Sequence, residues 1–266
     1  MPPGRVAPGG TGAWQPSRRV PDVALSVTVL GCDASYAGAG GACSGYLVRT
    51  AATSLWVDCG PGTLANVQEH LPLSELDAVL VSHQHPDHFG ELPVLYNALA
   101  FYEQRPPLPV YTTAGVHRLT TEINGHDCTG PLDWRIIDES AEVVVGDVSV
   151  RFSRTDHPVE TLAMCFEAGG ASIVYSADTG PGWSPARFGR RPDVLVLEAT
   201  LRRQHEDQAP HLSGAQAGRL AAEVDAGCLV LTHRPPGSDP ALYVEEAAAG
   251  FAGMVDVAAI GRTFVA

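Results

Sequence analysis

Lysine is absent from the sequence of 266 residues, so every basic side chain is an arginine. The formal net charge is −13, and a polyanion such as RNA would meet net repulsion from such a surface, although a local arginine patch can still exist. The charge balance therefore favours small substrates, and no long nucleic acid is expected as a partner.

Long apolar runs and paired cysteines are also lacking. No stretch approaches the roughly 18 consecutive apolar residues of a membrane helix, and the six cysteines are scattered without Cys-x-x-Cys pairs, as in the reduced thiols of a cytoplasmic protein. Arg18-Arg19 before an apolar stretch imitates an export signal, but Pro21 and Asp22 interrupt it, and Leu25–Leu30 serves well as a core strand. We expect a cytoplasmic protein without a membrane segment.

The chain contains no internal repeat and no interior linker. Residues 1–20 are rich in Gly and Pro and predict a flexible arm, followed by one domain over residues 21–266. The first apolar runs, at 25–30, 45–49 and 54–57, predict antiparallel strands at the edge of a sheet. Later patterns alternate between strands and helices, with helices expected at 63–70 and 89–102. The chain is thus predicted to have an α/β fold.

A dense histidine motif follows the apolar run 78–81. His83 and His85 lie two positions apart, so in an extended segment they face the same way and can hold one ion. Pro86 then turns the chain, and Asp87 and His88 are expected to open the next helix, facing a neighbouring point in space. This arrangement predicts two adjacent metal ions.

Other polar groups follow apolar strands farther along the chain. Strand ends are rigid and the loops beyond them are free, so active sites gather there. Imidazole and carboxylate ligands without thiolate suit Zn²⁺, with Mn²⁺, Fe²⁺ or Co²⁺ as alternatives. Asp58 either supports the site from behind or caps a turn. We predict that two divalent metal ions are held by His83, His85 and His157 on one side, by Asp87, His88 and His233 on the other, and by Asp178 bridging both.

These motifs resemble those of the metallo-β-lactamase superfamily. The segments 175–180 (YSADTG), 197–200 (LEAT) and 211–213 (HLS) are similar to those of its tRNase Z-like phosphodiesterases. The resemblance implies a four-layer αββα sandwich with the metals at one edge of the sheets, and a homodimer. tRNase Z enzymes insert a long tRNA-binding arm between the positions of His157 and Asp178, whereas only residues 158–177 separate them here. The chain looks closer to short actinobacterial proteins that resemble cyclic-nucleotide phosphodiesterases.

The expected activity is hydrolysis of a small-molecule phosphodiester, foremost a 3′,5′-cyclic nucleotide, by a hydroxide that bridges the two metals. The residues assigned to catalysis are Asp87, His211 and Glu198, with His211 stabilising transition-state oxygens or protonating the leaving group and Glu198 orienting its ring. Three alternatives remain open: a thioesterase or lactonase, because the same hydroxide attacks carbonyl carbon, a tRNA 3′ endonuclease, and a non-catalytic metal-binding protein. Arg234, directly after His233, is the best candidate to receive phosphate among the arginines of these loops.

Overall fold

The computed structural model describes residues 24–103 and 105–266, so the predicted arm over residues 1–20 and the Arg18-Arg19 pair lie outside the described part. Within that part the strands form two sheets of seven. The first sheet has the order β14-β1-β2-β3-β4-β5-β6 and the second β13-β12-β11-β10-β9-β8-β7. The strand bounds are β1 Ser26–Gly31, β2 Gly45–Arg49, β3 Ser54–Val57, β4 Ala78–Val81, β5 Leu108–Thr112, β6 Leu132–Ile136, β7 Glu142–Val145, β8 Val148–Arg154, β9 Leu162–Ala168, β10 Ala171–Tyr175, β11 Val194–Glu198, β12 Cys228–Thr232, β13 Met254–Val257 and β14 Thr263–Val265.

Both sheets are mixed. In the first, β14, β1, β2 and β3 pair antiparallel, while β3 to β6 run parallel. In the second, β7 to β10 are antiparallel and β10 to β13 parallel. The first three strands are antiparallel as predicted, but their predicted place at a sheet edge is wrong. The C-terminal strand β14 pairs with β1 through Val27 and Phe264 and takes that edge.

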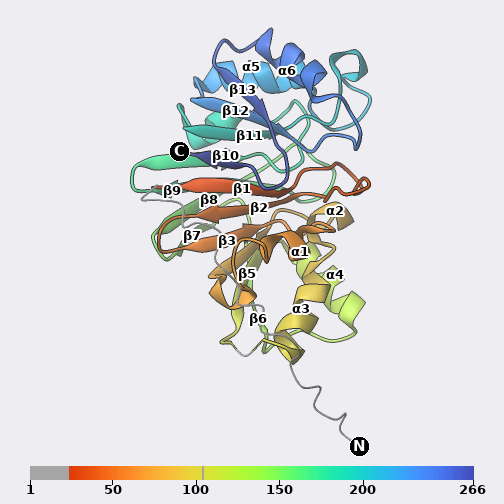
Figure 1. Cartoon of the computed structure of the whole chain (residues 1–266), viewed down its shortest axis with the longest axis vertical. Helices are drawn as coiled ribbons and strands as arrows, with labels where there is room; N and C mark the ends of the chain where they lie inside the picture. The colour runs from red at the N-terminus through yellow and green to blue at the C-terminus, as the bar shows by residue number, and fades with distance from the viewer. Residues whose placement is uncertain (1–23, 104) are drawn as a thin grey trace, which may run out of the picture.

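Helices cover the outer faces of the two sheets (Figure 1). Beside the first sheet lie α1 (Thr63–Val67), α2 (Pro86–Phe89), α3 (Leu92–Phe101) and α4 (Ala114–Asn124), and beside the second lie α5 (Gly214–Val224) and α6 (Pro240–Ala248). Short 3₁₀ turns occur at Leu73–Glu75, Pro185–Phe188 and Arg203–His205. One apolar cluster joins the outer face of the first sheet to α3 and α4, and another joins the second sheet to α5 and α6. The predicted four-layer αββα sandwich is therefore confirmed.

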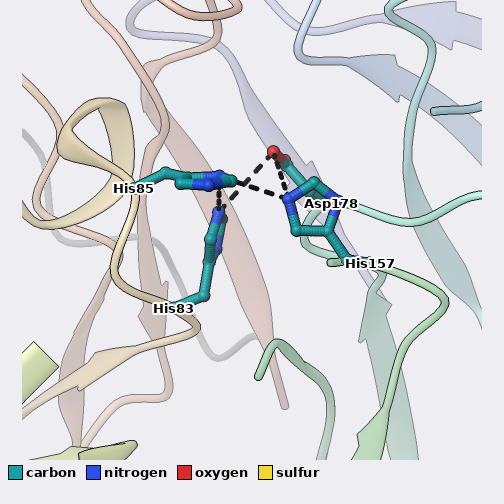
Figure 2. A group of neighbouring side chains, drawn as sticks. All are labelled: His83, His85, His157 and Asp178. Atoms are coloured by element: carbon teal, nitrogen blue, oxygen red, sulfur yellow. Dashed lines mark hydrogen bonds and ion pairs between the residues drawn. The ribbon is translucent and has the colours of Figure 1, made fainter. Parts of the chain in front are cut away.

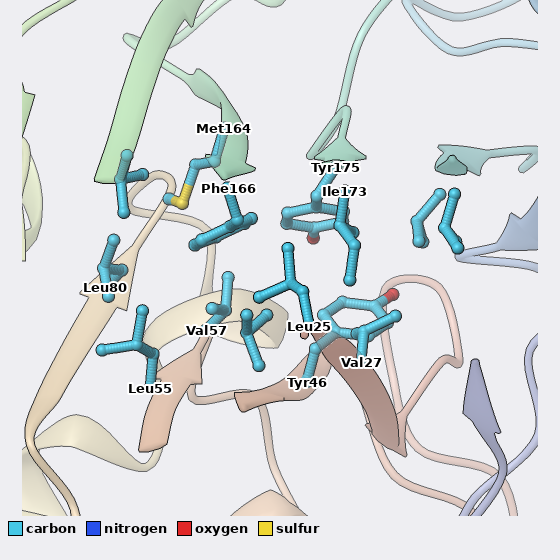
Figure 3. Packing of buried hydrophobic residues seen from close by; sticks show 14 of the residues in the cluster. Leu25, Val27, Tyr46, Leu55, Val57, Leu80, Met164, Phe166, Ile173 and Tyr175 are labelled. Atoms are coloured by element: carbon cyan, nitrogen blue, oxygen red, sulfur yellow. The ribbon is translucent and has the colours of Figure 1, made fainter. Parts of the chain in front are cut away.

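The central core lies between the sheets, where alternate residues of each strand point inward (Figure 3). Leu55, Val57 and Leu80 extend from the first sheet toward Met164 and Phe166 of the second, and all five are at most 1% exposed. Burial of apolar surface contributes about 25 cal/mol per Å². The apolar surface buried in this layer is therefore the main contribution that holds the two sheets face to face. The sheets in turn fix the strand ends that carry the polar groups.

Two predicted helices differ from the structure. The helix expected over 63–70 ends at Val67. The one expected over 89–102 is divided at Gly90 and Glu91, because the Glu91 N–H donates to the Cys59 carbonyl (2.8 Å). The Glu91 carboxylate then accepts the N–H groups of Gly62 and Leu64 at the start of α1. Glu91 thus accepts hydrogen bonds from N–H groups that have no partner within α1. Local periodicity does not reveal such a contact between distant segments.

Candidate metal centre

The His83–His88 motif lies where β4 ends and α2 begins. His85 is the N-cap of α2 in extended conformation, and Pro86 occupies the first helical turn, where its missing N–H costs nothing. The single turn of α2 then presents Asp87 and His88 from a different direction than the extended His83. His83, Asp87 and His88 are all buried. The motif therefore presents its side chains in two directions, as predicted.

The first group of ligand atoms consists of His83, His85, His157 and Asp178 (Figure 2). His83 Nε2 lies 3.0 Å from His85 Nδ1, which lies 3.2 Å from His157 Nε2. Asp178 Oδ2 faces the same point, at 3.6 Å from His83 Nε2 and 4.0 Å from His157 Nε2. His157 arrives from the loop after β8 and Asp178 from the loop after β10. Three segments that are distant in sequence thus converge on one point.

The second group consists of Asp87, His88 and His233, which follows β12. His233 Nε2 lies 3.2 Å from Asp87 Oδ2 and 3.3 Å from His88 Nε2. The other oxygen of Asp178, Oδ1, lies 3.1 Å from His88 Nε2 and 3.5 Å from His233 Nε2. Asp178 therefore turns one oxygen toward each group, the position that a bridging carboxylate requires.

These residues fit divalent cations chemically. Asp178 Oδ1 is buried and has no hydrogen-bond partner despite its short approach to His88. In both groups unprotonated imidazole nitrogens would face one another at 3.0–3.3 Å, which is repulsive unless a proton or a cation lies between them. A buried cluster of imidazoles and carboxylates without thiolate suits Zn²⁺ and similar ions.

The electrostatics of the cluster favour ionised carboxylates and a neutral His83. Burial lowers the pKa of His88, but Asp178 and Asp58 outweigh burial and raise that pKa. Burial lowers the pKa of His83 well below its usual value, so its ring is neutral and offers a lone pair. Burial alone would raise the pKa of Asp178, but the neighbouring His233 and His88 lower it well below the ordinary value. Burial likewise opposes ionisation of Asp87, yet the hydrogen bond and charge of His233, with the charge of His88, lower its pKa. Both carboxylates are thus ionised at neutral pH.

Glu198 and His211 meet beside the second group. His211 Nδ1 donates to Glu198 Oε1 at 2.8 Å, so its Nε2 edge is left to face the cluster. Ligand atoms of His211, Asp178 and His233 lie within 4.8 Å of one another, and the rings of His211 and His233 stack with centroids 5.7 Å apart. Burial lowers the pKa of His211, but the hydrogen bond to Glu198 and its charge outweigh burial and raise the pKa to about 9. The predicted pair is therefore in contact.

Comparison with known proteins adds the family. A model described as Beta-lactamase superfamily domain matches residues 53–234, which extend from β3 to just past His233. The chain belongs to the β-lactamase superfamily. Every residue predicted to bind metal lies within the matched segment of this superfamily domain.

Individual relatives agree with this assignment. The chain is 31% identical to the probable metallo-hydrolase YhfI of Bacillus subtilis, over 89% of this chain and 98% of that protein. The crystal structure of YhfI superposes with a TM-score of 0.82 at 29% identity, and the match covers 90% of this chain and 99% of the other. It is 30% identical to ribonuclease Z of Mycobacterium bovis over 88% of this chain and 95% of that enzyme. Unliganded yeast PDE1 shares the fold, with a TM-score of 0.72 at 13% identity over 92% of this chain and all of that one. The chain is thus a metallo-hydrolase of the β-lactamase superfamily.

Asp58 supports this superfamily site from behind, one of the two roles expected for it. Its buried carboxylate accepts the Ser82 N–H (2.7 Å), the Ser82 hydroxyl (2.9 Å), the Tyr175 hydroxyl (2.7 Å) and His88 Nδ1 (2.8 Å). Ser82 Oγ in turn lies 3.0 Å from His83 Nδ1. Asp58 therefore places the proton of two imidazoles on Nδ1, which leaves Nε2 of His83 and His88 for a metal.

Thr200 plays the corresponding part for His233, a role that sequence reasoning missed. Its hydroxyl donates to Glu198 Oε2 at 2.8 Å and lies 2.9 Å from His233 Nδ1. Because the single hydroxyl proton is directed to the carboxylate, the hydroxyl accepts the Nδ1–H of His233. Glu198 thus orients His211 directly and His233 through Thr200. The threonine lies two residues after Glu198 in LEAT, which was the only available signal.

We expect Thr200→Val, which keeps the shape and removes the hydroxyl, to weaken metal binding about 10- to 100-fold, the usual effect of losing a group that orients a ligand. Thr200→Ser should bind metal like the wild type. Competition with a chromophoric chelator measures the affinity directly. Equal affinities in the valine variant and the wild type would show that Thr200 does not orient His233.

The described residues contain no helix long and apolar enough to cross a membrane. All six cysteines are free thiols, and five of them are buried in this superfamily member. None belongs to either ligand group.

Proposed function

We propose that this metallo-hydrolase holds two divalent cations, preferentially Zn²⁺, and hydrolyses a small-molecule phosphodiester, foremost a 3′,5′-cyclic nucleotide. The two ligand groups that share Asp178 support a binuclear centre. When bound, such cations supply Lewis acidity and activate water at neutral pH. Because Mn²⁺, Fe²⁺ and Co²⁺ accept the same donors, metal analysis of purified protein is part of the test.

The contact between His211 and Glu198 favours a phosphodiester over a thioester. Attack of water on phosphorus forms a new P–O bond and breaks the bond to the ribose O3′, which keeps the electron pair and needs a proton. His211 faces the cluster with Nε2 while Glu198 holds its Nδ1 at 2.8 Å, so it is placed to protonate that oxygen or to stabilise transition-state oxygens. The oxygen of the attacking water stays on phosphorus, one of its protons balances the proton received by O3′, and the other is released to solvent, so the products are a nucleoside 5′-monophosphate and one proton. A thioester would expel a thiolate, which leaves without a proton.

The surroundings of His157 and Asp178 support a compact substrate. The segment between them consists of β9, β10 and short connections that include the Gly169-Gly170 turn, so no long arm extends from this position. Together with the net charge of −13, this favours a small molecule over the transfer RNA implied by the name of the ribonuclease Z relatives. A gel-shift assay at low salt should therefore show no RNA binding.

A substrate screen tests the proposal. Metal-loaded protein should hydrolyse 3′,5′-cyclic AMP or cyclic GMP together with bis(p-nitrophenyl) phosphate. Turnover of acyl thioesters or lactones without any phosphodiesterase activity would overturn it in favour of the thioesterase or lactonase alternative. Inactivity toward all of these substrates in protein that contains metal would contradict both.

We also propose a cytoplasmic homodimer with no membrane partner. The six free thiols are consistent with a reducing compartment. Large apolar side chains are exposed on and just after α3 (Val94, Phe101 and Tyr102) and on α4 (Ile123), as an interface between copies would require. Light scattering after gel filtration should report twice the monomer mass of 28.0 kDa.

A further inference from the structure

The loop between β1 and β2 is fastened to both sides of the second ligand group. The Ser35 N–H donates to Asp87 Oδ2 at 2.8 Å. The Ala34 N–H donates to the carbonyl of Arg234, and the Arg234 N–H donates back to the carbonyl of Cys32, at 2.9 and 3.2 Å. Arg234 directly follows His233. The loop thus forms a wall of the metal centre. It contacts the side chain of Asp87 and the backbone of Arg234, the neighbour of His233.

The loop is also rigid by construction. The Tyr36 N–H donates to the Ala34 carbonyl at 2.7 Å around Ser35, whose φ is +63°. This is the γ-turn with positive φ, which is rare and strained for a residue other than glycine. Asp33 Oδ2 accepts the Gly38 N–H at 2.9 Å and fills the space where a Cβ at Gly41 would lie. A strained backbone conformation persists only when its surroundings hold it in place. The backbone position of the residue after Ser35 is therefore well defined.

That next residue is Tyr36, an aromatic side chain that is 64% exposed. Phe101 and Tyr102 are the other large aromatic side chains with comparable exposure among residues 24–103 and 105–266, and they lie at the end of α3. Tyr36 alone of the three is adjacent to a residue bonded to a predicted metal ligand. Its Cα is one residue step, about 3.8 Å, from the Cα of Ser35. The Tyr36 backbone therefore lies one residue from the contact with Asp87, and its exposed ring is free to meet a bound molecule.

We propose that Tyr36 determines substrate specificity by stacking on the aromatic base of the nucleotide, an inference that rests on the proposed phosphodiesterase activity. Stacking on a tyrosine ring is favourable for every base because each has a π face. It requires little hydrogen bonding, so it selects for an aromatic ring and tolerates both adenine and guanine. Arg234, which we expected to receive phosphate, has its guanidinium over the Tyr243 ring at 5.6 Å, and it donates to Ser238.

The test compares Tyr36→Leu, Tyr36→Phe and the wild type on two substrates: 3′,5′-cyclic AMP and the 3′,5′-cyclic phosphate of 1-O-methylribose, which has the same reacting ring and no base. Tyr36→Leu should raise KM for cyclic AMP at least about 5-fold, the lower end for loss of a base–aromatic stack. Its kinetics on the substrate without a base should match the wild type. Tyr36→Phe, which keeps the ring, should match the wild type on both substrates.

The outcomes separate this inference from the proposed function. If the wild type hydrolyses neither cyclic phosphate, the proposed function fails, and the inference fails with it. If it hydrolyses cyclic AMP and Tyr36→Leu has the wild-type KM, only the stacking role is overturned. If Tyr36→Leu impairs both substrates equally, Tyr36 supports the loop and does not recognise the base, which also overturns the inference.

Discussion

Asp178→Ala is expected to lose both metals and to reduce kcat by at least about 10³-fold, because the loss of charge stabilisation at the reacting phosphorus amounts to several kcal/mol. Among the described residues, Asp178 is the one whose two oxygens face the two ligand groups, at 3.6 Å from His83 Nε2 and 3.1 Å from His88 Nε2. Without it, the imidazoles of both groups lose the carboxylate that they share. Metal content by mass spectrometry and turnover of cyclic AMP measure the two effects on the same sample.

The matched control is Asp133→Ala, which removes an exposed carboxylate paired with Arg135 on β6. It should retain metal and turnover, because an exposed ion pair contributes little to stability. Circular dichroism of Asp178→Ala should match the wild type, since the core between the sheets does not involve this side chain. If Asp178→Ala bound two metals per chain, the assignment of a bridging carboxylate would be wrong.

His211→Ala is expected to keep its metals and to lose turnover of cyclic AMP by about 10²- to 10⁴-fold, the usual contribution of a positioned proton donor. The seven predicted ligands remain in this variant, so the metal content should equal that of the wild type. His205→Ala is the matched control, because it removes an exposed imidazole from the same loop. We expect it to be fully active.

The leaving group distinguishes the two roles of His211. A p-nitrophenolate leaves without a proton, so bis(p-nitrophenyl) phosphate should be affected much less than cyclic AMP if His211 is the proton donor. Equal losses would indicate stabilisation of transition-state oxygens. A lower metal content in His211→Ala would show instead that His211 is a ligand, which its position within 4.8 Å of Asp178 and His233 permits.

Sequence patterns predicted the strands well where apolar residues were continuous. The runs 45–49, 54–57 and 78–81 coincide with β2, β3 and β4. The edge position of the first strands was wrong, because β14 pairs with β1 across more than 230 residues (Thr28 with Thr263) and local patterns carry no such information. The division between α2 and α3 was missed for a similar reason, since Glu91 serves the start of α1.

For the site, the sequence supplied both the residues and their grouping around two metals, and the resemblance supplied the fold and the phosphodiesterase branch. Polar groups at strand ends indicated His157, Asp178 and His233, which follow β8, β10 and β12; these strands run in the same direction in one sheet and end at the same edge. The orienting hydrogen bonds of Thr200 and the contact of Ser35 with Asp87 could not be predicted. Both depend on the exact approach of loops that are distant in sequence.

The position of attack tests the central claim most directly. Metal-loaded protein is incubated with 3′,5′-cyclic AMP in water enriched in ¹⁸O, and the product is examined by ³¹P NMR and mass spectrometry. We predict adenosine 5′-monophosphate with one ¹⁸O on phosphorus, as expected from attack of water on phosphorus and cleavage of the P–O3′ bond. Label on the ribose carbon, or no conversion of cyclic AMP by protein that contains its metals, would contradict the proposed phosphodiesterase.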